Sequence, residues 1–562
     1  MSILESAGGK WGRIRMIGWA AALGLGFFFT EEGTAAPAEI SPRKPDATPD
    51  KHEMAPMSDG VRLSTDLYFP PGEGPWPAIL MRTPYQRVSG QAAARQGCVG
   101  VVQSTRGRFD SEGVAGSFAD DGWVEHRDGY DAIRWIVAQP WCNGKVGTSG
   151  GSALGVTQNM LASTAPEGLV CQEISKAACN LYLDANYGGG VFRQALVTGW
   201  LRSNAFPPEV LQRIIDHPYY DEVQAGVDCS ARFALVRVPT FQVAGWYDVF
   251  LDGNIRAFEG LQYRGGSGAR GRQKILIGPW THGKTAGELD YPENASPQGA
   301  QLEPRRAQWF AHYLKGVDNG VEEWPAVTYY LMGACGEPGA PGNEWLTSDV
   351  WPIPHEPKAL YLGGGGKLSG AAPAGAEQRL SYRYDPSNPV PTLGGTNLNL
   401  DKGPYDQRKV EDRPDALVFT SDPLDKAVET AGAVQARLWA STSAQDTDFT
   451  AKLTDVYPDG RSMLVCDGIR RLSLRNGFSR PEFAAPGEVC ELEVEMQHTA
   501  MAFAPGHRIR LAISSSNAPR FEPNGNHGKP HLGDAEPVVA ENTVYVGPDR
   551  PSQLILPILK RP

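Results

Sequence analysis

The chain has 562 residues, a formal net charge of −11 at pH 7 and an ordinary globular composition, with 41% hydrophobic and 21% charged residues. A chain of this length is long enough for two to four domains. The acidic balance, with no run of five or more Lys and Arg residues, argues against a nucleic-acid-binding protein, because an acidic surface repels phosphate backbones.

The N-terminus has the layout of a secretory signal peptide. Basic residues between positions 10 and 15 precede an apolar run at 16–29, and Ala36-Pro37-Ala38 is a small-x-small cleavage pattern. The apolar run is shorter than the about 20 residues that a transmembrane helix needs. We therefore expect a periplasmic or secreted protein, cleaved after Ala38 and free of the membrane. Glu31 and Glu32 are unusual in a signal peptide, so an uncleaved anchor is the alternative.

Eight cysteines are spread along the chain, and none stands in a CxxC or a zinc-type spacing. This pattern argues against a metal site built on cysteine. Export makes disulfides possible, although the sequence does not assign them. Most of the cysteines are expected to be free and buried. Cys466 and Cys490 are the favoured pair, because they fall in one β-rich segment.

Strand and helix patterns alternate from residue 57 to about residue 165, which predicts a parallel α/β sheet. The expected elements are a hairpin at Asp59-Gly60, buried strands at 77–83 and 98–104, a helix at 128–139, a strand at 144–148 and a following helix that carries Leu154, Met160 and Leu161.

The alternation pauses between residues 166 and 236, where the pattern is aromatic and helical. It resumes with strands at 238–244 and 273–278, and a helix at 303–316 closes the unit. From about residue 351 helical periodicity nearly vanishes, and short strand-like runs recur between Gly, Pro and Asp turns. Many short strands at this spacing predict a sandwich or a jelly roll.

A nucleophile elbow is predicted at Ser152, between the strand at 144–148 and the next helix. The strained turn of an elbow requires small residues around the serine, and glycines stand at positions 150, 151 and 155. A literal G-x-S-x-G search selects Ser149 instead. That register would begin the helix with two glycines, each costing about 1 kcal/mol relative to alanine. Ser152 is therefore the predicted nucleophile, placed at a helix N-terminus whose N–H groups can meet an oxyanion.

Candidate triad partners follow in the order that α/β-hydrolases use. Asp248 comes after the strand at 238–244, and His282 comes after the strand at 273–278. In such a triad His282 takes the proton from Ser152, while Asp248 orients the imidazole and stabilises its charged form. The rate kcat/KM should then fall in acid with an apparent pKa of about 6–7.

Several segments in this order resemble the cocaine esterase-like family of α/β-hydrolases, which also contains the bacterial X-prolyl dipeptidyl peptidases and the α-amino-acid ester hydrolases. The matching segments are residues 57–70, 81–87 (MRTPYQR), 105–113 (TRGRFDSEG), 129–147, the elbow, 245–250 (GWYDVF), 278–282 (GPWTH), 309–316 and 506–521. The resemblance implies an α/β-hydrolase domain with an inserted helical cap, followed by an all-β jelly-roll domain. The corresponding boundaries are a signal peptide at 1–38, the hydrolase domain at 39–165 and 237–350, the cap at 166–236 and the jelly roll at 351–562.

The same resemblance places Ser152, Asp248 and His282 at the family's triad positions. It implies that the hydroxyl of Tyr85 and the backbone N–H of Ala153 form the oxyanion hole. The chain departs from the family pattern at Ala153, where a tyrosine is usual, and at Ser104, where an aspartate is common. The cap segment is also short, which puts substrate access in doubt.

Esters or amides of small carboxylic acids are the expected substrates. Enzymes that bind a free ammonium group need carboxylates in the pocket, and Leu154 and Gly155 offer none beside the nucleophile. The cap carboxylates are expected at the surface; they are Asp184, Asp216, Asp221 and Glu222. An X-Pro dipeptidyl peptidase or an α-amino-acid ester hydrolase is the first alternative. The second is a non-catalytic binding protein with a lectin-like jelly roll. The acyl-enzyme mechanism needs no metal ion and no organic cofactor.

Overall fold

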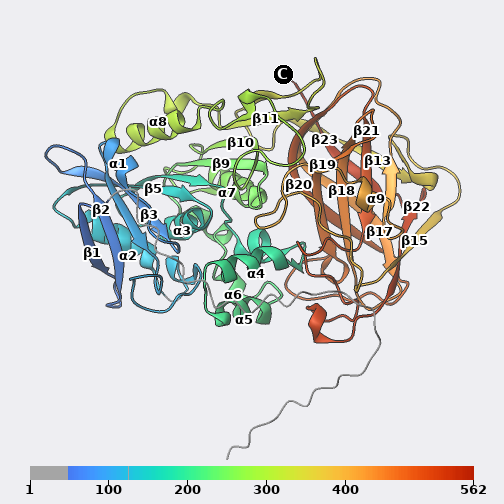
Figure 1. The fold of residues 1–562 in the computed structure, drawn as a ribbon, viewed down its shortest axis with the longest axis horizontal. Coiled ribbons are helices and arrows are strands. Elements are labelled where there is room, and N and C mark those ends of the chain that lie inside the picture. Colours follow the sequence, from blue (N-terminus) through green and yellow to red (C-terminus); the bar gives the residue numbers. More distant parts are fainter. Residues whose placement is uncertain (1–47, 125, 562) are drawn as a thin grey trace, which may run out of the picture. The chain divides into compact units, whose positions relative to one another are not determined.

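The structure is a computed structural model that describes residues 48–124 and 126–561. The predicted signal peptide and the cleavage position after Ala38 lie outside these residues. Figure 1 shows an α/β part, coloured blue to green, beside a β-rich part, coloured orange to red, with cap helices in the lower centre of the view. Among the described residues, no helix combines the length and the apolar character needed to cross a membrane.

A central sheet organises the α/β part, in the order β1-β2-β4-β3-β5-β6-β9-β10-β11-β12. The strands run parallel from β4 to β11, and the two ends of the sheet are antiparallel. Parallel strands place their carboxyl ends along one edge, where α/β enzymes position catalytic groups. The strands are β1 (Lys51–Pro56), β2 (Arg62–Tyr68), β3 (Trp76–Thr83), β4 (Val99–Ser104), β5 (Cys142–Gly151), β6 (Leu169–Ser175), β9 (Thr240–Tyr247), β10 (Lys274–Thr281), β11 (Val327–Gly333) and β12 (Glu344–Ser348).

Helices cover both faces of this sheet. Alternate residues of a strand point to opposite faces: in β3, Ala78 and Leu80 join one apolar cluster and Ile79 joins another. The first cluster contains residues of α2, α3 and α7, and the second contains residues of α1 and α8. The predicted α/β-hydrolase architecture is confirmed. The helices are α1 (Gln91–Arg95), α2 (Asp128–Val137), α3 (Ala153–Ala162), α7 (Leu251–Arg264) and α8 (Leu302–Lys315).

The cap begins later than predicted, because the segment expected to open it is a strand of the central sheet. β6 pairs in parallel with β5 and β9. Two polar residues, Gln172 and Glu173, interrupt its apolar pattern although both are buried. Glu173 is tolerated there because Arg306 Nε bonds its Oε1 at 2.9 Å. The cap then contains β7 (Tyr187–Gly188), β8 (Val191–Phe192), α4 (Gln194–Ser203), α5 (Pro208–Asp216) and α6 (Glu222–Ala225).

The C-terminal domain is built from antiparallel strands in two packed layers. One layer has the order β16-β21-β18-β19, and the other is centred on β17, which pairs with β20, β22 and β23. Apolar residues of β18 and β21 share one core with residues of β17 and β20. The strands are β13 (His355–Gly363), β14 (Lys367–Ser369), β15 (Gln378–Tyr384), β16 (Leu417–Thr420), β17 (Val428–Thr442), β18 (Asp448–Val456), β19 (Ser462–Arg471), β20 (Cys490–Phe503), β21 (Arg508–Ser514), β22 (Ala540–Val546) and β23 (Gln553–Leu559).

The favoured disulfide is wrong, because Cys466 and Cys490 are both free thiols. In β19, Gly468 lies against Glu495 of β20. Cys490 stands five residues before that contact, which is about 17 Å along a strand at about 3.4 Å per residue. A disulfide requires Cα atoms within about 7 Å. The two cysteines therefore belong to the same domain but lie at different levels along its strands, too far apart to form a disulfide.

Candidate active site

Ser152 sits in a strained turn between β5 and α3. Its backbone has φ +57° and ψ −127°, a conformation that costs a non-glycine residue about 1–3 kcal/mol. A Cβ at Gly150 would lie 2.6 Å from Leu154 Cβ, and a Cβ at Gly155 would lie 2.5 Å from Ala177 Cβ. The glycines around Ser152 are therefore required by close packing, as expected for an elbow in this register.

Ser149, the alternative nucleophile, lies within β5 rather than at its end. Its hydroxyl donates a hydrogen bond to Glu173 Oε2 at 2.9 Å. Glu173 is itself paired with Arg306, so this serine belongs to a buried polar cluster of the sheet. The geometry favours Ser152 as the nucleophile and gives Ser149 a structural partner instead.

Asp248 and His282 are brought together at the carboxyl ends of β9 and β10. Asp248 Oδ2 lies 2.8 Å from His282 Nδ1, and its Oδ1 accepts the backbone N–H of Phe250 at 2.8 Å. Burial alone would raise the pKa of the Asp248 carboxyl, but the charge and hydrogen bond of His282, the charge of Lys176 and the backbone N–H of Phe250 hold it below its usual value. Asp248 therefore stays ionised and can orient the imidazole.

Ser152 and His282 are related through Phe250 and not by a direct bond. Within the described residues, no hydrogen bond joins the Ser152 hydroxyl to the imidazole; the serine instead bonds Tyr85. The Phe250 ring packs edge-on against His282, with centroids 5.5 Å apart, and lines one cavity with Ser152. Catalytic hydrogen bonds of unliganded enzymes are often long and tighten when substrate binds. The triad assignment thus stays a prediction that this arrangement supports.

Lys176, which the sequence analysis did not identify, holds the histidine loop in place. Its Nζ donates to the carbonyl of Thr281 at 2.8 Å and to that of Gly283 at 2.5 Å, on both sides of His282. Burial lowers the pKa of Lys176, and the attraction of Asp248 partly opposes this. No motif marks this lysine in the sequence, because its role depends on β6, a strand that was not recognised.

The predicted oxyanion donors lie beside Ser152. Trp200 Nε1 of the cap donates to the Tyr85 hydroxyl at 2.9 Å, so the phenol accepts this bond and can direct its own proton into the site. Burial raises the pKa of Tyr85, which keeps the phenol protonated as a donor. Among the described residues, the backbone N–H of Ala153 has no acceptor. Both donors are available, and their roles remain predictions.

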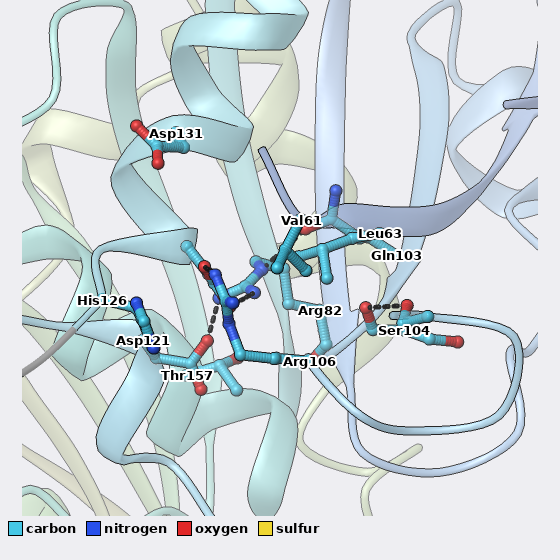
Figure 2. Close-up of polar contacts among 12 residues, drawn as sticks. Val61, Leu63, Arg82, Gln103, Ser104, Arg106, Asp121, His126, Asp131 and Thr157 are labelled. Carbon is cyan, nitrogen blue, oxygen red and sulfur yellow. Dashed lines mark hydrogen bonds and ion pairs between the residues drawn. The ribbon is translucent and has the colours of Figure 1, made fainter. Parts of the chain in front are cut away.

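A cluster of buried charges fixes the end of β3, from which the oxyanion loop begins (Figure 2). Arg82 bonds Asp121, and Arg106 forms a bidentate pair with Asp128 at 2.9 and 2.6 Å. The Thr157 hydroxyl of α3 donates to the carbonyl of Arg82 at 3.2 Å. This bond ties the helix that follows the nucleophile to the strand that carries the oxyanion loop.

An apolar cavity of about 100 Å³ opens beside Ser152, and we call it the acyl cavity. Cap and core side chains form its walls, among them Phe118, Val156, Leu181, Leu196, Val197, Trp200, Leu201 and Phe250. Among the described residues, no Asp or Glu lines it, and its charged lining residue is Arg213, which is exposed on α5. The cavity suits an uncharged apolar group next to the serine.

The cap carboxylates do not face this cavity. Asp216, Asp221 and Glu222 are exposed, as predicted. Asp184 was also expected at the surface, but it is buried at 4% exposure because its Oδ2 accepts the backbone N–H groups of Cys179 and Asn180. Within residues 48–124 and 126–561, no group of three or more His, Cys, Asp and Glu residues is arranged to hold a metal ion.

Two family models match the chain. The X-Pro dipeptidyl-peptidase (S15 family) model matches residues 59–209 and 202–284, and the X-Pro dipeptidyl-peptidase C-terminal non-catalytic domain matches residues 319–555. The cocaine esterase of Rhodococcus sp. (strain MB1 Bresler) is 34% identical over 581 residues, covering 90% of this chain and 98% of that protein.

Solved structures agree with this match. An aminopeptidase from the marine sediment archaeon Thaumarchaeota archaeon has a TM-score of 0.79 at 25% identity, covering 95% of this chain and all of that chain. An α-amino acid ester hydrolase has a TM-score of 0.75 at 25% identity, covering 92% of this chain and all of that chain. The protein is a serine hydrolase of the α/β-hydrolase type, and it belongs to the cocaine esterase-like group of the X-Pro dipeptidyl-peptidase S15 family.

Proposed function

We propose that this protein is a serine esterase that prefers carboxylic esters with an apolar, uncharged acyl group. The observation that carries the proposal is the acyl cavity beside Ser152, whose lining in the described part of the chain includes no carboxylate. Burying an ammonium group there would cost several kcal/mol, because no opposite charge would compensate for its lost hydration. An apolar acyl group would gain about 25 cal/mol for each Å² that it buries.

The proposed reaction is acyl transfer through Ser152. The serine Oγ attacks the ester carbonyl while His282 takes its proton, and Asp248 stabilises the imidazolium that forms. The developing oxyanion accepts hydrogen bonds from the Tyr85 hydroxyl and the Ala153 backbone N–H. His282 then protonates the leaving alcohol, and water activated by the same histidine releases the acid from the serine. No step requires a metal ion or a cofactor.

Hydrolysis of α-aminoacyl esters or X-Pro peptides is the alternative, since relatives carry those names. Such substrates present an ammonium group that needs a carboxylate nearby. Asp184, a buried carboxylate of the cap, lines another cavity, where Arg256 contacts it at 3.4 Å. Its position favours the plain ester.

The deciding experiment compares two substrates of equal shape and different charge. Methyl phenylacetate and the methyl ester of phenylglycine differ by one ammonium group. We expect kcat/KM for the uncharged ester to exceed that for the ammonium ester at least about tenfold at pH 6, where the amine, which titrates at or below about 7.7–8.0, is mostly charged and its burial is costly. Equal rates, or turnover of X-Pro anilides alone, would overturn the proposal. A fluorophosphonate label on Ser152, identified by mass spectrometry, tests the nucleophile independently.

We further propose that the protein is exported. The basic, apolar and small-residue regions before residue 39 support a cleaved signal peptide. N-terminal sequencing of the protein recovered from the periplasm or medium should begin after Ala38, and an intact cytoplasmic N-terminus would refute this.

The two antiparallel layers of the C-terminal domain also support the jelly roll predicted for residues 351–562.

A further inference from the structure

A second cavity, of about 170 Å³, lies where the cap, α7, β19 and β20 meet, and we call it the polar cavity. Four arginines and four carboxylates line it, so its formal charge is balanced, and the pairing of these groups decides what it can bind. The charged lining residues are Arg193, Arg256, Arg470, Arg520, Asp184, Asp252, Asp467 and Glu495.

Two of the arginines are paired with buried carboxylates. Arg520 Nη1 contacts both carboxylate oxygens of Asp467, at 2.7 and 2.8 Å. Arg256 Nε lies 3.4 Å from Asp184 Oδ1. Arg520 nevertheless keeps one buried donor, its Nε, without a partner among the described residues.

Arg193, at the N-terminal end of α4, is buried at 5% exposure and has no carboxylate partner. Its two terminal nitrogens donate only to backbone carbonyls, those of Asp184 and Val249. Its Nε is also without a partner in the described part of the chain. Burial, and then repulsion by Arg520, lowers the pKa of Arg193 to about 10, so it is still charged at neutral pH. Asp184, Asp252 and Asp467 attract Arg193 electrostatically, but no carboxylate among the described residues forms an ion pair with it, so a bound anion would supply a direct partner.

We propose that the polar cavity binds a small organic carboxylate beside Arg193 and Arg520, two buried arginines that line it. Guanidinium groups bind carboxylates strongly because their donors match the two oxygens. The remaining wall is apolar, with Val249, Ile469 and Phe521 among its residues. A carboxylate with a small apolar body satisfies both halves of this lining.

A narrow cavity of about 10 Å³ shares Leu196 and Leu398 with the acyl cavity, and Arg193 and Arg520 with the polar cavity. This volume is about that of one water molecule, so an organic acid cannot pass through it. The carboxylate site therefore does not depend on the proposed function.

Calorimetric titration of sodium benzoate into the mature Ser152→Ala protein, in chloride-free buffer, tests the site without turnover. Arg193→Gln should weaken binding at least about tenfold, because it removes a charge-assisted hydrogen bond. Arg213→Gln, which changes the exposed arginine of the acyl cavity, is the matched control and should leave the affinity unchanged. The reverse pattern would place the anion in the acyl cavity and overturn the proposal, as would no binding at all. Equal affinity for inorganic phosphate would overturn the assignment to an organic carboxylate.

A direct location of the ligand covers the case in which Arg193→Gln does not fold. Crystals of the Ser152→Ala protein soaked in 4-bromobenzoate should show anomalous bromine density in the polar cavity. Density confined to the acyl cavity or to the surface would refute the site. Density in the polar cavity, together with no ester turnover by the wild-type protein, would refute the proposed esterase and leave the carboxylate site standing.

Discussion

The acyl cavity and the polar cavity, which both include residues at α4, differ in the charge of their lining residues. The acyl cavity, on the side of Ser152, is walled mostly by apolar side chains, and none of its described lining residues is a carboxylate. The polar cavity, on the side of Arg193, gathers arginines and carboxylates from three parts of the fold. The acyl cavity at α4 is suited to uncharged groups, whereas the polar cavity at the N-terminal end of the same helix attracts an anion. This contrast supports an esterase that prefers an uncharged acyl group. Four substitutions test the comparison.

The largest effect is expected for Ser152→Ala. The loss of the nucleophile should reduce kcat by about 10⁴-fold or more, as in other serine triads. Ser149→Ala is the matched control and should change kcat by less than about tenfold, because Ser149 bonds Glu173 inside the sheet. Measurement of ester hydrolysis with folded variants distinguishes the two. A stronger loss for Ser149→Ala would move the elbow to the other register.

The next effect concerns stability in the polar cavity. Asp467→Asn breaks the buried pair with Arg520, and leaving a buried charge unpaired typically costs about 3–5 kcal/mol of unfolding free energy. Glu495→Gln, an exposed position of the same cavity, should cost less than about 1 kcal/mol. Denaturant unfolding of both variants gives the comparison. Equal unfolding free energies for the two variants would show that the Asp467–Arg520 pair does not stabilise the protein.

Tyr85→Phe should lower kcat by about 10²–10³-fold, since it removes one oxyanion donor and leaves the acyl cavity intact. Burial raises the pKa of Tyr85, so the phenol loses its proton only above its usual titration near pH 10. We therefore expect no alkaline loss of kcat between pH 8 and about pH 10. An unchanged kcat in Tyr85→Phe would remove Tyr85 from the oxyanion hole.

The smallest effect is expected for Lys176→Met, which releases the loop on both sides of His282. We expect kcat to fall about tenfold with little change in KM, because misplacing the base affects the reacting step more than substrate binding. The lysine charge also opposes protonation of the site, so its removal should move the acid limb of kcat/KM to higher pH. Lys176→Arg keeps the charge and should keep the limb in place. A pH profile identical to wild type in Lys176→Met would leave the residue with a structural role alone.

Local sequence patterns were sufficient for much of the candidate site. The glycines around Ser152 predict an elbow, because only small residues fit where Gly155 packs against Ala177. Asp248 and His282 each follow an apolar strand, and parallel strands end at a common edge. The order of these motifs therefore located the candidate triad without the structure.

Other features required the tertiary structure, since they depend on partners distant in sequence. β6 contains Glu173, whose burial is possible because Arg306, more than a hundred residues later, pairs with it. Lys176 likewise bonds partners that are more than a hundred residues away in the sequence, the backbone carbonyls of Thr281 and Gly283.

By itself, the sequence determined the parallel α/β sheet, the predicted elbow and the order of the candidate triad, because these follow from local periodicity and from the small residues that a strained turn requires. The tertiary structure decided which charges are paired. Cys466 and Cys490 are too far apart along their strands to bond, Asp184 is buried rather than exposed, and Arg193 is left without a carboxylate. Pairing depends on distances of a few ångströms between elements that are remote in the chain, and a linear pattern does not carry that information.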